Sequence, residues 1–144
     1  MSIRIPGNAF NGISALGAKA PEAGFYEVSI VELANPTNAP GKRRLYMTFE
    51  NGYKTFDFMN FPFDDNGNAL QGLKENQVRG QLAAVKAILM SLGYTNQEIE
   101  GAPTITDEWF LTAQNGGRKA HVEFTPGQAG VQGSYNKFAW KTKA

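Results

Sequence analysis

The stretch RRLYMTFENGYKTFDFMNF, residues 43–61, carries the strongest secondary-structure signal in the chain. Apolar and polar side chains alternate on both sides of Asn51-Gly52, which is typical of two β-strands with one face turned to a core. Asn-Gly favours a two-residue type I′ turn, so the sequence predicts a hairpin in which Glu50 lies opposite Tyr53. In that register the face expected in the core carries Leu45, Met47, Phe49, Phe56 and Phe58. The face expected outside carries Arg44, Tyr46, Tyr53 and Phe61.

Further strands are expected on both sides of this hairpin. Residues 24–33, 119–125 and 134–142 each alternate as strands do. Between the hairpin and the last two strands, apolar residues from Val78 to Leu92 at spacings of 4 and 3 predict a helix. Three strands, a helix and two strands is the order of an OB-fold. The sequence therefore predicts a mainly β protein, a five-stranded OB-fold barrel with a helix between strands 3 and 4.

Local signals also predict where helices begin and end. Gly93 should end the long helix in a left-handed cap. Thr95 and Glu98 have the spacing of a capping box, so a second short helix is expected to start there. Residues 106–111 are expected to form one more turn, with Trp109 packed inward.

Length and composition indicate one domain. A chain of 144 residues with 42% apolar residues can close a single core. Residues 1–23 show no strand or helix period and should form an extended N-terminal arm, leaving residues 24–144 as the OB-fold domain. The chain has no cysteine, and no apolar run is long enough for a membrane span or a signal peptide. We expect a soluble cytoplasmic protein.

Charge is distributed unevenly. The net charge of +1 argues against an indiscriminate polyanion binder. Residues 42–54 nevertheless carry +3 and residues 118–144 carry +4. If the fold brings these two segments together, they make one positive face.

The predicted fold suggests where a ligand would bind. In OB-fold barrels, the outer face of strands 2 and 3 and the adjoining loops bind oligonucleotides or oligosaccharides. Aromatic side chains there can stack on unpaired bases, and cations can contact phosphates. The alternative is that the aromatic side chains cover the barrel and the cations are solvated strand ends. The candidate nucleic-acid-binding residues are Lys42, Arg43, Arg44, Tyr46, Tyr53, Lys54, Phe61, Lys119, Tyr135, Lys137 and Lys141.

No residue pattern typical of catalysis stands out. The oxygen-bearing side chains that follow Asp64 imitate a calcium loop, but Ala69 stands where that loop needs glycine. His121 is the single histidine, and the adjacent Asp107 and Glu108 lack the further carboxylates of a two-metal site. We therefore expect a binding protein, not an enzyme, with no catalytic residues, cofactor or metal.

The sequence also resembles the single-stranded DNA-binding proteins of tailed bacteriophages, a divergent OB-fold group. The similarity rests on GFYEV at 24–28, KRRLY at 42–46 and LGY at 92–94. It covers roughly residues 24–142.

This resemblance implies a sequence-tolerant coat on single-stranded DNA during phage DNA replication or recombination, in the host cell cytoplasm. Tyr46, Tyr53 and Phe61 would stack on bases, and replication or recombination proteins would be further partners. Such proteins often carry an acidic tail that recruits partner enzymes. This sequence ends in FAWKTKA, residues 138–144, so recruitment through a tail is not implied.

Two other classes of function remain open. One is a structural virion or assembly module, in which the aromatic strands make subunit contacts. The other is an OB-fold that binds an oligosaccharide or a protein strand, because a fold alone does not fix its ligand. Phosphate binding weakens steeply with salt, whereas sugar binding and apolar assembly do not.

Overall fold

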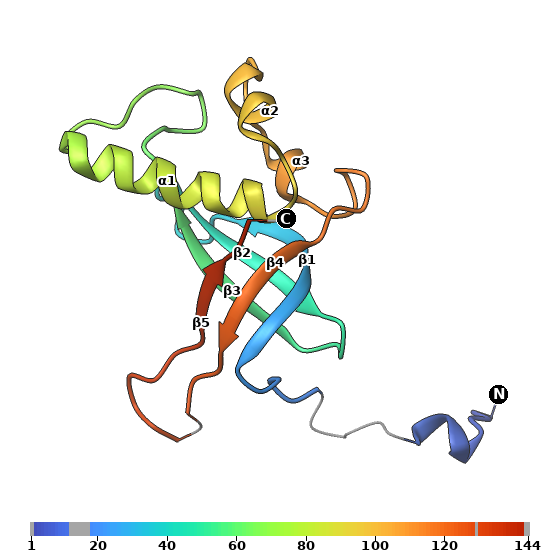
Figure 1. Ribbon diagram of the computed structural model, residues 1–144. Helices are drawn as coiled ribbons and strands as arrows, with labels where there is room; N and C mark the ends of the chain where they lie inside the picture. The colour runs from blue at the N-terminus through green and yellow to red at the C-terminus, as the bar shows by residue number, and fades with distance from the viewer. Residues whose placement is uncertain (1, 12–17, 129, 143–144) are drawn as a thin grey trace.

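The computed structural model describes residues 2–11, 18–128 and 130–142 (Figure 1). Its five antiparallel strands form one sheet in the order β3-β2-β1-β4-β5, which curls into a half-barrel. The strands are β1 Gly24–Ala34, β2 Lys42–Phe49, β3 Lys54–Asn60, β4 Ala120–Thr125 and β5 Lys137–Trp140. The helices are η1 Gly7–Phe10, α1 Glu75–Ser91, α2 Asn96–Gly101 and α3 Asp107–Phe110. The prediction of a mainly β chain with a helix between strands 3 and 4 is confirmed.

The core lies between the inner face of the sheet and the end of α1. The inward alternation expected for β1 and β2 is confirmed, because those side chains are at most 3% exposed. They are Val28, Ile30, Leu45, Met47 and Phe49. Phe124 from β4 is 0% exposed and its ring touches four other aromatic rings.

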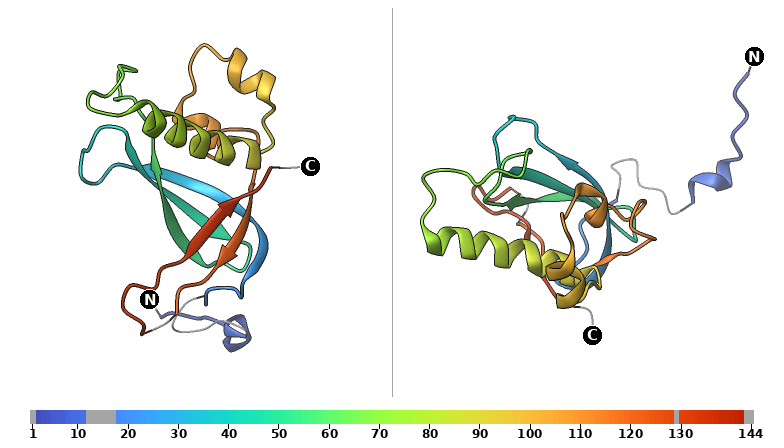
Figure 2. Two further views of the ribbon diagram at one scale, coloured as in Figure 1. Left: turned by 60° about the vertical axis from the view of Figure 1, so that its left-hand side comes forward. Right: turned by 90° about the horizontal axis from the view of Figure 1, so that it is seen from above.

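Helix α1 packs on the barrel through its C-terminal half. Leu89 and Leu92 are buried, whereas Leu82 is 42% exposed, because the first turns of α1 extend beyond the barrel (Figure 2). The predicted helix is confirmed. Within the described ranges, the helices are too short or too polar to cross a membrane.

The predicted helix ends are confirmed. Gly93 has a φ of 94°, the left-handed conformation expected after α1. The Thr95 hydroxyl accepts from Glu98 N, and the Glu98 carboxylate accepts from Thr95 N, both at 3.1 Å. In α3, Trp109 is half-buried, while the following Phe110 is the residue that enters the core.

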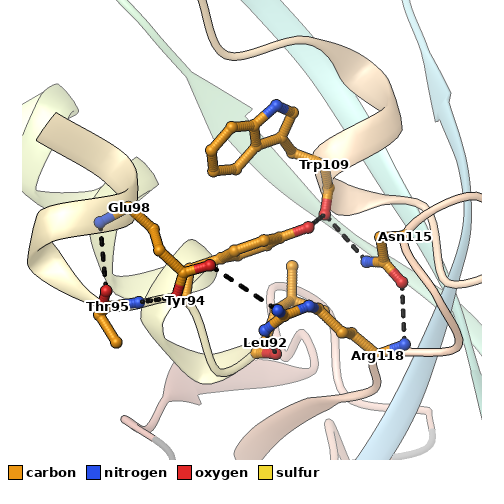
Figure 3. A network of polar contacts seen from close by, with 7 residues as sticks. All are labelled: Leu92, Tyr94, Thr95, Glu98, Trp109, Asn115 and Arg118. Atoms are coloured by element: carbon orange, nitrogen blue, oxygen red, sulfur yellow. Dashed lines mark hydrogen bonds and ion pairs between the residues drawn. The ribbon is translucent and has the colours of Figure 1, made fainter. Parts of the chain in front are cut away.

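Arg118 ties the helices to the start of β4 (Figure 3). Its guanidinium Cζ lies 4.2 Å from the centroid of the Tyr94 ring, and its Nη1 donates to Leu92 O at 3.4 Å. Tyr94 OH donates to Trp109 O at 2.8 Å, and Asn115 Nδ2 donates to the same oxygen at 2.9 Å. These groups bond to one another, so we assign the cluster a structural role.

The hairpin loop is one residue longer than the sequence suggests. Phe49 N donates to Tyr53 O at 2.8 Å, and Gly52 N donates to Phe49 O at 2.9 Å, which leaves three residues in the loop. Gly52 closes it with a φ of 91°, as the last residue of a three-residue hairpin loop commonly does. Asn51 Oδ1 accepts from Tyr53 N at 2.9 Å and braces the turn. The predicted two-residue turn is therefore wrong.

This extra loop residue reverses the two faces of β3. Phe56 pairs with Tyr46 and Phe58 pairs with Arg44, each one residue away from the expected partner. The prediction that Phe56 and Phe58 lie in the core is wrong, since they are 36% and 64% exposed. The prediction that Tyr53 points outward is also wrong.

Side chains join β3 to β5, the two edges of the sheet. Asn136 Nδ2 donates to Tyr53 OH at 2.9 Å and to Thr55 Oγ1 at 3.1 Å. Trp140 Nε1 donates to Asp57 Oδ2 at 3.1 Å. β3 turns the polar side chains of Thr55 and Asp57 inward. The contacts from β5 and the residue before it give these side chains hydrogen-bond partners, which a purely apolar interior would not provide.

The contact between Asp57 and Trp140 predicts a pH effect on stability. Burial raises the pKa of the Asp57 carboxyl, although hydrogen bonds from Trp140 and from Phe58 N lower it in part. At pH values between the ordinary pKa of an aspartate and the raised pKa of Asp57, this carboxyl is protonated more often in the folded state than in the unfolded state. The free energy of unfolding therefore falls as the pH rises through this range. Asp57→Asn lacks this titration. We expect the melting temperature of the wild type, relative to Asp57→Asn, to rise as the pH is lowered from about 7 to about 4. A difference that is constant, or that moves the other way, would contradict this assignment.

The N-terminal segment contacts the barrel close to β1. Asn51 Nδ2 donates to Lys19 O at 3.1 Å, and Tyr26 OH donates to Glu22 O at 2.6 Å. Residues 2–11 extend away from the sheet and bury no side chain in η1 (Figure 2). Residues 12–17 of the expected arm lie outside the described residues.

Candidate nucleic-acid interface

The outer face of the β2–β3 hairpin combines aromatic rings with cations. Antiparallel pairing places Tyr46 opposite Phe56 and Arg44 opposite Phe58, and cross-strand pairs share one face of a sheet. Lys54 lies on the same face of β3, two residues before Phe56. We call these five residues, Arg44, Tyr46, Lys54, Phe56 and Phe58, the outer patch.

The rings of the outer patch form a continuous surface. The centroids of Tyr46 and Phe56 are 5.4 Å apart with an interplanar angle of 50°. Phe56 and Phe58 are also 5.4 Å apart, at 90°. The Arg44 Cζ lies 5.1 Å from the Phe56 centroid, which is cation–π distance. The guanidinium is thus held beside the rings before any ligand arrives.

Exposure of these rings is costly for a protein that needs only to fold. Phe58 keeps 64% of its surface in water, and it stands on an edge strand where apolar exposure invites association. Tyr53 and Met59 pack toward the core from the opposite side of the chain. Their packing does not depend on which residues occupy the outer positions 56 and 58. Exposed aromatic rings of this kind make the outer patch the candidate binding surface.

Arg43 and Phe61 do not belong to this surface, although the sequence predicts them as binding residues. The Arg43 side chain is 13% exposed, and its Nη2 lies 2.6 Å from Asp65 Oδ1. Its Cζ lies 5.4 Å from the Phe61 centroid. Phe61 itself packs against the core. Arg43 and Phe61 therefore hold the segment after β3.

Tyr53 is also placed differently from its predicted role. The centroid of its ring lies 5.8 Å from that of Phe49 and 6.3 Å from that of Phe124, on the inner face of the sheet. Its hydroxyl accepts from Asn136, at the base of the β4–β5 loop. Asn136 Oδ1 in turn accepts from Gly127 N at 2.8 Å, which closes that loop. Tyr53 therefore supports a loop beside the edge of β3.

Two of the remaining predicted residues, Tyr135 and Lys137, come near the edge of β3. Tyr135 and Lys137 flank Asn136, whose side chain bonds to β3, so the loop brings them to the edge of the hairpin. Tyr135 is 76% exposed and precedes β5, whereas the sequence places it inside that strand. Lys42 is exposed at the first residue of β2.

Two other predicted cations lie elsewhere on the sheet. Lys119 precedes β4, and Lys141 follows β5 with its Nζ 3.7 Å from Glu123 Oε1. In the sheet order, β1 separates β2 from β4. The two basic segments of the sequence therefore meet only in part.

Phe56 and Phe58 are the residues that sequence reasoning missed. Within residues 54–60, phenylalanine is more apolar than Thr55 or Asp57, so alternation alone favours the face that carries Phe56 and Phe58 as the inward one. A different signal was present in the turn, because Glu50-Asn51-Gly52 also fits a three-residue loop that ends in glycine. That alternative exchanges the two faces of β3.

No metal site is evident in the described part of the chain, where no three acidic, histidine or cysteine side chains converge. Asp64 Oδ1 accepts from the backbone N of Asn66 and of Asn68, both at 2.9 Å, so this carboxylate shapes a turn. His121 Nε2 lies 2.6 Å from Glu27 Oε1 on the outer face of the sheet.

No protein-family model, curated protein or solved structure matches this chain. The geometry of the outer patch is therefore the basis for a functional proposal.

Proposed function

We propose that the protein binds single-stranded DNA in a largely sequence-tolerant way. Phe58, Phe56 and Tyr46 stack on bases, and Arg44 and Lys54 contact phosphates. The observation that carries the proposal is the outer patch, in which the exposed Phe56 and Phe58 rings share one sheet face with the half-buried Tyr46 ring and with two cations. Every base offers a π face and every nucleotide a phosphate, so this combination suits unpaired strands of any sequence.

The topology supports the same proposal. The strand order, with a helix between β3 and β4, is that of an OB-fold, and we propose that the half-barrel is a divergent member of that class. OB-folds bind oligonucleotides on the outer face of strands 2 and 3, where the outer patch lies. The loops expected to flank the ligand are residues 35–41 and 126–136.

The β4–β5 loop offers a second contact. Its base is attached to β3 through Asn136, and it carries the exposed Tyr135 next to Lys137. A ring and a cation beside the edge of β3 extend the stacking surface beyond the hairpin. We propose that a strand lying along β3 meets this loop.

For the biological setting, we propose phage DNA replication or recombination in the cytoplasm of the host cell. This part of the proposal rests on the resemblance of residues 24–142 to phage single-stranded DNA-binding proteins. The role is that of a non-catalytic coat on exposed strands.

A titration with labelled DNA tests the function. We expect oligo-dT to bind at least about tenfold more tightly than duplex DNA of equal length, because rings can stack only on unpaired bases. The logarithm of the binding constant should fall with the logarithm of salt concentration by about 0.7 per phosphate contact. Fluorescence anisotropy at two salt concentrations measures both quantities.

The same experiment distinguishes the other classes of function. Equal affinity for duplex DNA would remove the stacking mechanism. Absence of DNA binding, together with self-association that is insensitive to salt, would favour an assembly module.

A further inference from the structure

A β-bulge in β1 turns a carboxylate toward the outer patch. The register between β1 and β2 shifts between Ile30 and Glu32, with Val31 as the extra residue. In a regular strand, Glu32 would share the inner face with Ile30. The bulge instead places Glu32 opposite Tyr46, on the outer face. Bulges that re-aim a side chain recur beside functional sites.

Glu32 completes a row of side chains across three strands. Glu32 pairs with Tyr46, and Tyr46 pairs with Phe56. Neighbouring strands are about 4.8 Å apart, so a base stacked over Tyr46 has an edge within reach of a glutamate on the next strand. The row therefore offers a stacking surface with a hydrogen-bond acceptor at its side.

The Glu32 carboxylate does not serve as a counter-ion for a cation of the described residues. Glu32 is exposed, and within the described residues no hydrogen bond or ion pair reaches its side chain. Arg44, in the adjacent row, lies over the Phe56 ring instead. A negative charge on a face that binds phosphates opposes binding unless it contacts a donor on the ligand. The position of Glu32 thus points to a base with donors on its edge.

We propose that Glu32 gives the site a preference for guanine at one position of the bound strand. This inference rests on the proposed function. Guanine presents N1–H and a 2-amino N–H side by side, which match the two oxygens of a carboxylate. Adenine and cytosine present one amino group there. Thymine presents one N3–H between two carbonyl oxygens, which repel a carboxylate.

Binding of matched oligonucleotides tests the preference. One strand of about 15 nucleotides is all dT, and another has dG at every third position, so that each binding register offers an isolated guanine. We expect the wild type to bind the dG strand at least about fivefold more tightly. Replacing dG by deoxyinosine, which lacks the 2-amino group, should remove most of that preference.

Two variants complete the experiment. Glu32→Gln keeps the size of the side chain but loses one acceptor and the charge, so the preference should disappear while all-dT binding is retained. Glu50→Gln, an equal change of charge at the exposed hairpin loop, should keep the preference. Equal wild-type affinity for both strands, or a preference that survives in Glu32→Gln, overturns the inference and leaves the proposed function standing. Failure to bind either strand overturns both.

Discussion

Replacing Phe56 and Phe58 together by alanine should weaken binding of oligo-dT by about 30-fold or more and leave the fold intact. The expected loss is about 1 to 3 kcal/mol for each base that loses its stacking partner. Phe56 and Phe58 are 36% and 64% exposed and lie outside the hydrophobic core, so the change leaves no cavity in the core. The free energy of unfolding should fall by no more than about 1 kcal/mol per site, the range of strand propensity.

Phe25 provides a matched control for this double variant. It is 72% exposed on the outer face of β1 and lies outside the outer patch. Phe25→Ala should therefore leave oligo-dT affinity unchanged. Unaltered affinity in the Phe56 and Phe58 double variant, measured beside this control, would exclude the outer patch as the stacking surface.

The salt dependence separates stacking from phosphate contacts. Removal of Phe56 and Phe58 should leave the salt slope nearly unchanged, because no phosphate contact is lost. Arg44→Ala should lower both the affinity and the slope. Its effect also includes loss of the cation–π contact with Phe56.

Replacing Phe124 by alanine should lower the free energy of unfolding by about 3 to 5 kcal/mol, the range for a large core side chain. Phe124 is 0% exposed and lies at the centre of the aromatic core. Its centroid is 4.8 Å from that of Phe49 and 5.5 Å from that of Phe138. Truncation leaves a cavity among these rings, and a loss of this size is a large part of the stability of a typical domain.

Urea denaturation monitored by tryptophan fluorescence measures this effect. If Phe124→Ala does not fold, Phe124→Leu is the milder substitution and should still lose more stability than Phe25→Ala. A loss below about 1 kcal/mol for Phe124→Ala would contradict the assigned core.

Much of the fold follows from local features of the sequence. The alternation of β1 and β2 and the 3.6-residue period of α1 depend on the covalent geometry of short segments, so they can be inferred without a partner. The same is true of the left-handed Gly93 and of the capping box at Thr95 and Glu98. Each of these predictions is confirmed.

The candidate site was predictable in location but not in composition. The sequence indicates the β2–β3 hairpin, and Arg44, Tyr46 and Lys54 lie on its outer face. Tyr53, Phe61 and Arg43 are instead bound to the core or to neighbouring loops. Net charge by segment could not separate these cases, because it does not record which side chains are already paired.

Which face of β3 is exposed depends on long-range contacts in the folded protein. Alternation fixes which residues share a face, but it does not say which face turns inward. That choice depends on a three-residue loop and on Asn136 and Trp140, which are distant in sequence and bond to Thr55 and Asp57. The strands and helices thus follow from local sequence patterns. The contacts between β3 and β5 turn Phe56 and Phe58 to the solvent, because buried polar groups must find partners.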